Sequence, residues 1–139
     1  MRILGLDFGS KTVGVAITDP LGMTAQGMEI VRRESPNKLR KTLSRIETII
    51  KENDVELIVL GLPVNMDGSS GERVEKTKEF ADMLTRRSGV EIVFQDERLT
   101  TVEAYEIMNE AGIKREDRYK YVDQIAATII LEDYLNSHR

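Results

Sequence analysis

The sequence contains no cysteine, and its only histidine is His138, next to the end of the 139 residues. Disulfides, thiolate metal sites and a cysteine nucleophile are therefore excluded, and nothing points to an oxidising compartment. A histidine general base or a histidine-rich zinc site is not expected either, because a side chain this close to the terminus is expected to fray. The chemistry open to the chain is therefore that of its carboxylates.

Long apolar runs and aromatic residues are also scarce. The apolar run from Leu57 to Val64 is far too short to span a bilayer, and Met1 to Asp7 contains no signal-peptide hydrophobic region. We therefore expect a cytoplasmic protein that is neither secreted nor inserted in a membrane. Aromatic residues make up 5% of the chain, which argues against extensive stacking on nucleic-acid bases.

Charge, in contrast, is plentiful and unevenly distributed. The chain is 40% hydrophobic and 32% charged, as expected of one folded domain over residues 1–139. The net charge is −4, yet seven basic residues oppose two glutamates between Arg32 and Lys51, and five acids oppose one arginine between Asp96 and Glu110. A basic flank beside an acidic pocket suits a metal-dependent enzyme acting on a polyanion, although two ordinary solvated faces give the same pattern.

The order of elements predicts a mixed α/β fold. Strands are expected over 3–8, 12–18, about 23–32, 57–60 and 90–95, and helices from Ser35, after Ser69, from Thr100 to about Gly112 and over 121–135. Ser35-Pro36 and Ser69-x-x-Glu72 supply helix-start signals, and residues 114–120 are expected to be a polar linker. A meander of three strands followed by crossovers gives a central five-stranded mixed sheet flanked by about four helices, the topology of a ribonuclease H-like domain.

Three acids lie where the local sequence makes a carboxylate costly. Asp7 interrupts the apolar strand 3–8, where an unpaired charge costs several kcal/mol. Glu97 follows the apolar strand 90–95, at the edge where open α/β sheets place their sites. Asp123 shares one side of the last helix with the apolar residues three, four and seven positions further on. These three residues are therefore the candidates for a functional site.

Each acid also has an ordinary structural interpretation. Asp7 could cap the turn after its strand, Glu97 could be a surface-loop acid, and Asp123 could interact with a helix dipole. Together the three could bind hard divalent cations through oxygen, which suits Mg²⁺ or Mn²⁺. Two such ions about 4 Å apart can clamp the attacking and leaving oxygens of a phosphodiester. Asp96 adjoins Glu97, and since side chains alternate along a strand, only one of the two is expected to point into the site.

Four separated motifs resemble the YqgF family of bacterial ribonuclease H-like proteins. They are GLDFGSKTVGVA (residues 5–16), GLPVNMDG (61–68), DERLTT (96–101) and VDQIAA (122–127), and in this order they cover essentially the whole chain. Members of that family are described as Holliday junction resolvases or as pre-16S ribosomal RNA nucleases. The resemblance implies a metal-dependent endonuclease that hydrolyses phosphodiester bonds. Its catalytic and metal-binding residues would be Asp7, Glu97 and Asp123, and its cofactor Mg²⁺ or Mn²⁺.

The resemblance favours a role in processing pre-16S rRNA near its 5′ end. This choice of substrate rests on the resemblance, because no residue here distinguishes RNA from DNA. One alternative is a Holliday junction resolvase acting on four-way DNA, which requires a symmetric dimer to place two sites across the junction. Another is a nucleic-acid-binding or transcription factor without catalysis. Both a monomer and a homodimer stay open.

Several basic side chains are candidates for contact with nucleic-acid phosphates. They are Arg73, Lys76 and Arg98, together with Lys38, Lys41 and Arg45 on the basic helix. A solvated helix face would explain the same charges. The segment Gly68-Ser69-Ser70-Gly71 could offer backbone N–H groups to a phosphate, and an ordinary turn and cap explains it equally well.

Overall fold

The computed structural model describes residues 1–35, 38–63, 71–97 and 100–138. Its strands are β1 (Arg2–Phe8), β2 (Thr12–Thr18), β3 (Ala25–Arg32), β4 (Val55–Leu62) and β5 (Glu91–Asp96). They form one five-stranded sheet in the order β3-β2-β1-β4-β5. The first three strands are an antiparallel meander, whereas β4 pairs parallel with β1, and β5 pairs parallel with β4. The prediction of a mixed sheet built on a meander is confirmed.

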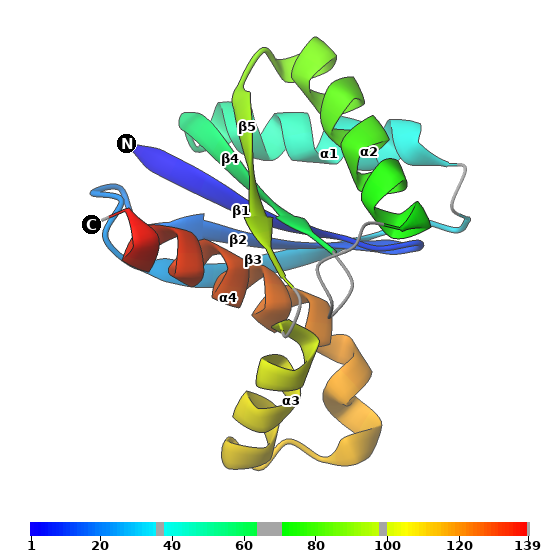
Figure 1. Cartoon of the computed structure of the whole chain (residues 1–139), viewed down its shortest axis with the longest axis vertical. Helices are drawn as coiled ribbons and strands as arrows, with labels where there is room; N and C mark the ends of the chain where they lie inside the picture. The colour runs from blue at the N-terminus through cyan, green and yellow to red at the C-terminus, as the bar shows by residue number, and fades with distance from the viewer. Residues whose placement is uncertain (36–37, 64–70, 98–99, 139) are drawn as a thin grey trace.

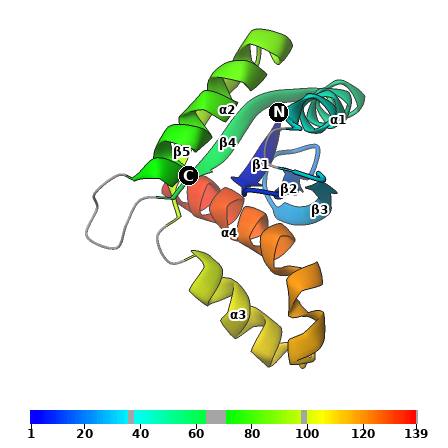
Figure 2. The same ribbon diagram turned by 90° about the vertical axis from the view of Figure 1, so that its right-hand side faces the viewer.

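The helices form a layer on each face of the sheet (Figure 1). Two of them, α1 (Leu39–Glu52) and α2 (Glu72–Ser88), cover one face, and α4 (Val122–Ser137) crosses the other. Figure 2 shows that α3 (Thr100–Glu110) and the 3₁₀ helix η1 (Arg115–Lys120) project away from the sheet, beside the start of α4. None of the helices in the described ranges has the length and apolar character needed to cross a membrane.

Side chains of β1 enter two separate cores. Leu4 and Leu6 belong to the core beneath α1 and α2, whereas Ile3 belongs to the core beneath α4. Because side chains alternate along a strand, Asp7 shares the α4 face with Ile3, and Phe8 shares the opposite face with Leu6. The carboxyl end of β1 therefore presents an acid on one face of the sheet and an aromatic ring on the other.

Glycine residues let α4 lie unusually close to the sheet. A Cβ atom added at Gly14 would lie 1.9 Å from the backbone oxygen of Asp123, and one added at Gly5 would lie 2.8 Å from Cβ of Leu131. Both distances are far inside van der Waals contact, so a larger residue would displace the helix. Gly14 is also the direct cross-strand partner of Asp7. Its missing side chain therefore allows the first turn of α4 to approach the end of β1.

Two predicted helix starts are wrong. The first helix begins at Leu39, after Lys38, whose N–H donates to the Ser35 carbonyl at 3.1 Å. The second begins after Gly71, whose carbonyl accepts the N–H of Val74 at 3.1 Å. Pro36 and Ser69, on which those predictions relied, lie outside the described residues.

The remaining boundaries follow local chemistry more closely. Gly89, predicted to end the second helix, adopts a left-handed φ of 71° that favours glycine, and the prediction is confirmed. Gly112 ends the region of α3 in the same way, with φ of 74°. The expected polar linker at 114–120 is wrong in part, because residues 115–120 form η1.

Candidate active site

The carboxyl ends of β1, β4 and β5 bring Asp7 and Glu97 together. The backbone N–H of Glu97 donates to the carbonyl of Leu62 at 3.3 Å, so Glu97 continues β5 alongside the end of β4. Its side chain lies over Gly61, where an added Cβ would stand 2.9 Å from Oε2 of Glu97. The carboxyl groups of Asp7 and Glu97 share a hydrogen bond. Glycine at position 61 therefore provides the space in which this pair of acids forms.

Burial and mutual repulsion raise the pKa of both acids. Burial raises the pKa of Asp7 to about 6, with the hydrogen bond from Glu97 opposing it and the charge of Asp123 adding to it. Burial, followed by the negative charge of Asp7, raises the pKa of Glu97 to about 9. At neutral pH Glu97 therefore keeps its proton and donates it to the Asp7 carboxylate.

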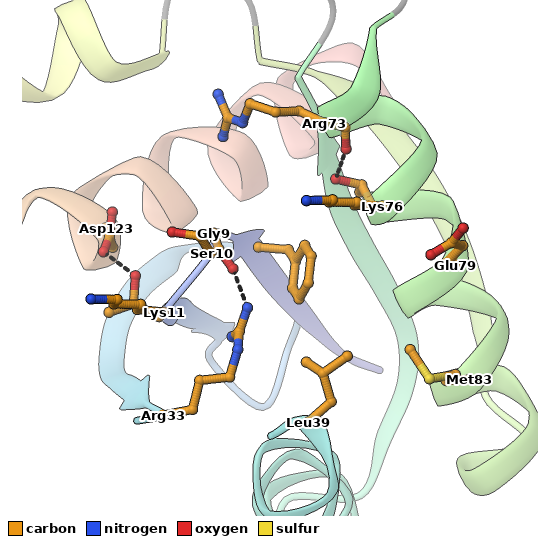
Figure 3. Close-up of a pocket in the computed structure, with 13 residues that line it drawn as sticks. Gly9, Ser10, Lys11, Arg33, Leu39, Arg73, Lys76, Glu79, Met83 and Asp123 are labelled. Atoms are coloured by element: carbon orange, nitrogen blue, oxygen red, sulfur yellow. Dashed lines mark hydrogen bonds between the residues drawn. The ribbon is translucent and has the colours of Figure 1, made fainter. Parts of the chain in front are cut away.

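Asp123 lies near this pair but has a hydrogen-bond partner of its own. The Thr12 hydroxyl donates to Oδ2 of Asp123 at 2.5 Å, and Figure 3 shows Asp123 at one side of the adjoining pocket. Its negative charge raises the pKa of both Asp7 and Glu97, which places it within electrostatic range of them. We call these three residues, Asp7, Glu97 and Asp123, the acidic site.

The paired acids fit a divalent cation. Oε1 of Glu97 is buried and has no hydrogen-bond partner among the described residues. A buried oxygen without a partner is costly, and carboxylate oxygens are the ligands that Mg²⁺ and Mn²⁺ prefer. In residues 1–35, 38–63, 71–97 and 100–138, no group of three or more acidic or histidine side chains is arranged to hold an ion. Of the three acids, only Asp7 and Glu97 are in contact, and Asp123 is held by the Thr12 hydroxyl within electrostatic range of them.

The basic candidates on α2 lie at this end of the sheet. Arg73 and Lys76 line a pocket of about 700 Å³ to which Asp123 also contributes. In Figure 3 the Arg73 side chain extends from the start of α2 across the pocket. Its positive charge lowers the pKa of Asp7 and of Glu97, so it acts directly on the acidic site.

The basic candidates on α1 are differently placed. Lys38 forms an ion pair with Glu34 at 3.1 Å, Arg45 forms one with Glu29 at 2.6 Å, and Lys41 is exposed. Arg98 and the predicted phosphate-binding residues 68–70 lie outside the described residues. Asp96, the neighbour of Glu97, is exposed.

Sequence reasoning missed Thr12 and Arg33. Thr12 reads as an ordinary strand residue, because its partner Asp123 is 111 positions away and no local pattern links them. Arg33 counts only as one more basic residue after the third strand, yet its side chain donates to the carbonyl of Gly9, 24 positions earlier. Such long-range contacts leave no signal in the sequence pattern.

A mixed sheet with acids at the carboxyl ends of β1 and β5 defines a protein with the ribonuclease H-like fold. The structure of Thermus thermophilus RuvC in complex with a Holliday junction substrate matches 99% of this chain and 95% of that chain, with a TM-score of 0.56 and 14% identity. The fowlpox virus Holliday junction resolvase matches 100% of each chain, with a TM-score of 0.60 and 15% identity. At these identities the likeness shows the fold alone.

Sequence comparison identifies the family. The family model described as "RuvX: Holliday junction resolvase" matches residues 1–137. A protein of Agathobacter rectalis named "Putative pre-16S rRNA nuclease" is 65% identical over 136 residues, 98% of this chain and 95% of that protein. A Lachnospira eligens protein of the same name is 55% identical over 137 residues, 99% of this chain and 98% of that protein. The chain belongs to the RuvX family, and the resemblance carried by its four motifs is confirmed.

Proposed function

We propose that this protein is a metal-dependent endonuclease that hydrolyses a phosphodiester bond of pre-16S rRNA near its 5′ end. The observation that carries the proposal is the contact between Asp7 and Glu97, two acids that share a proton beside Asp123. A protein without a use for them would gain stability by losing these acids, since their repulsion raises the energy of the fold. The names of the two relatives support the choice of substrate.

The residues of the acidic site would hold Mg²⁺ or Mn²⁺ through their oxygens. When bound, such an ion supplies the Lewis acidity that polarises a phosphodiester. The chain itself fixes the geometry: Gly61 makes room for Glu97, and the Thr12 hydroxyl orients Asp123. Arg73 adds a positive charge beside the acids, which attracts the phosphate of the substrate.

A four-way DNA junction is the second candidate substrate, supported by the description of the family model. Resolving a junction requires two sites related by a two-fold axis, and therefore a symmetric dimer. Cleavage of pre-rRNA requires only one site. The two substrates can therefore be separated by the products and by the oligomeric state in which cleavage occurs.

The test incubates purified protein and Mn²⁺ with an end-labelled RNA spanning the 5′ end of 16S rRNA, and in parallel with a labelled four-way junction. We expect cleavage of the RNA at a defined position. Asp7→Asn should abolish it, whereas the control Asp82→Asn, an exposed acid on α2, should leave it unchanged. Symmetric cleavage of the junction alone would contradict the RNA assignment. Binding of both substrates with cleavage of neither would favour a factor without catalysis.

A further inference from the structure

The pocket beside the acidic site carries an excess of positive charge. Four of its side chains are cationic, Lys11, Arg33, Arg73 and Lys76, against the two carboxylates Glu79 and Asp123. Lys76 pairs with Glu72 at 3.1 Å on the exposed surface of α2. Lys11 and Arg33 have no ion pair with another described residue. A pocket with a net positive charge is suited to binding an anion.

Arg33 is held in a fixed position with donors to spare. Its Nη2 donates to the Gly9 carbonyl at 2.5 Å, and its guanidinium carbon lies 5.0 Å from the centre of the Phe8 ring. Its Nε and Nη1 are buried and have no partner among the described residues. Burial lowers the pKa of the Arg33 guanidinium, as expected of a charge with no carboxylate beside it. Unpaired charged donors of this kind are costly unless an acceptor binds there.

The pocket offers phosphate recognition without base recognition. Phe8, the aromatic side chain in its wall, stacks on Phe80 with ring centroids 4.3 Å apart, and Arg33 covers its other face. No face of the ring is left for a base to stack on. The remaining apolar wall consists of Leu39 and Met83, which suits a sugar as well as any base. An occupant would therefore be held through its phosphate.

The pocket and the acidic site are joined by Asp123, which belongs to both. Asp7 and Phe8 are consecutive residues of β1 on opposite faces of the sheet, so the pocket reaches around the end of β1 from the α4 face to the α2 face. Residues 9–11, which form the β1–β2 turn, line the pocket, so a linear chain lying from one face to the other would cross this turn. Nucleic acid is such a chain, with a phosphate at every repeat.

We infer that this pocket binds one backbone phosphate of the substrate strand, close to the bond that is cleaved, through Arg33 and Lys11. The inference rests on the proposed nuclease function and adds to it the path of the substrate. Because the contact is to phosphate, it does not select the sequence of the strand. Its loss weakens binding uniformly across sequences.

A purely structural role for Arg33 is the competing explanation, because Arg33 also braces the β1–β2 turn. Its backbone N–H donates to the Lys11 carbonyl at 2.9 Å, and its side chain holds the Gly9 carbonyl. The salt dependence of binding separates the two roles, since a brace releases no counterions when a phosphate binds. The test therefore measures a slope as well as an affinity.

The experiment titrates fluorescent single-stranded RNA with wild-type protein, Arg33→Gln, Arg33→Lys and Lys11→Gln, without divalent ions and at several salt concentrations. Each lost phosphate contact should flatten the slope of log K against log salt by about 0.7, which corresponds to about fivefold weaker binding at 0.1 M salt. Arg33→Lys should keep most of the slope because it keeps the charge. The control Arg86→Gln, an exposed arginine in the last turn of α2, should leave the slope unchanged.

A second arm replaces one phosphate at a time by a neutral methylphosphonate. At one position of the RNA, the methylphosphonate should weaken binding to the wild-type protein but not to Arg33→Gln, as expected when Arg33 and that phosphate are partners in a double-mutant cycle. Unchanged slopes for both Arg33→Gln and Lys11→Gln, or the absence of any such position, would overturn the inference even where the wild type cleaves RNA. Wild-type protein that binds with an Arg33-dependent slope but cleaves nothing would overturn the proposed function and leave the pocket assignment intact. No binding at all would overturn both.

Discussion

Replacing Glu97 by glutamine is expected to stabilise the protein at alkaline pH in the absence of divalent ions. The pKa of Glu97 is raised from 4.5 to about 9 because the side chain is buried next to Asp7. A carboxyl group whose pKa is higher in the folded state binds its proton more tightly there. Its contribution to stability is therefore fully present below about pH 4.5 and is lost as the pH rises toward 9. Glutamine keeps the shape and a hydrogen-bond donor to Asp7 and has no charge to lose.

The size of this stability difference follows from the pH range between the unfolded and folded pKa values of Glu97. The interval from pH 5 to pH 8, three pH units, lies inside the range 4.5 to 9 over which the folded and unfolded states differ in protonation of Glu97. At about 1.4 kcal/mol per unit, the wild type loses up to about 4 kcal/mol that the variant keeps. For a chain of this size, 1 kcal/mol corresponds to about 3 °C in Tm, so the difference at pH 8 approaches about 12 °C.

The assay is thermal unfolding of both proteins in EDTA from pH 5 to pH 8. Near pH 5 the two melting temperatures should agree within a few degrees, and the variant should be increasingly the more stable above pH 6. Glu91→Gln, at an exposed glutamate of β5, the strand that Glu97 follows, is the matched control and should follow the wild type throughout. Added Mn²⁺ should raise the Tm of the wild type more than that of Glu97→Gln. Parallel curves for wild type and variant, or a variant less stable at pH 8, would show that Glu97 is not a buried protonated acid.

Three further substitutions test the geometry around the acidic site. Gly14→Ala should lower the free energy of unfolding in urea by more than about 3 kcal/mol, because its Cβ would lie 1.9 Å from the Asp123 backbone oxygen. The control Gly89→Ala, in open space at φ 71°, should lower it by only about 1 kcal/mol. Thr12→Val removes the 2.5 Å hydrogen bond to Asp123 and should slow single-turnover cleavage about tenfold, whereas Thr12→Ser should restore the rate. Equal cleavage rates for wild type and Thr12→Val would show that Thr12 does not position Asp123. Replacing Lys38, Lys41 and Arg45 together by alanine should flatten the slope of log K for RNA binding against log salt by no more than about 0.7. Two of the three side chains are already paired, with Glu34 and Glu29. A larger change in slope would show that all three side chains contact the substrate.

The sheet could be predicted from the sequence because its signals are local. Apolar runs of strand length, separated by short turns, define the first three strands, and a helix between two further apolar runs requires a parallel crossover. The helix starts could not be predicted with the same success. Serine followed by proline suits both a helix cap and a turn, so this pair alone does not fix the start of the helix, which lies at Leu39.

The acidic site was partly predictable for a similar reason. The carboxyl ends of parallel strands meet at one edge of a sheet, so an acid at the end of β1 and another after β5 must lie close together. The proton shared by Asp7 and Glu97 could not be predicted, since it depends on the separation of two side chains from distant parts of the chain. The contacts of Thr12 with Asp123 and of Arg33 with Gly9 have the same origin.

The two-residue period of β1 explains why an acid and a positive charge can lie at the same end of one strand without forming an ion pair. Asp7 faces α4, where glycines bring the helix close and burial raises its pKa. Phe8 faces α2, and its ring stabilises the positive charge of Arg33, which lies over it. Opposite charges in direct contact would pair with each other and leave neither free for a ligand. The sheet lies between Asp7 and Arg33, which leaves Asp7 available for a cation and Arg33 for a phosphate, whereas Asp123 and Arg73 lie where the pocket meets the acidic site.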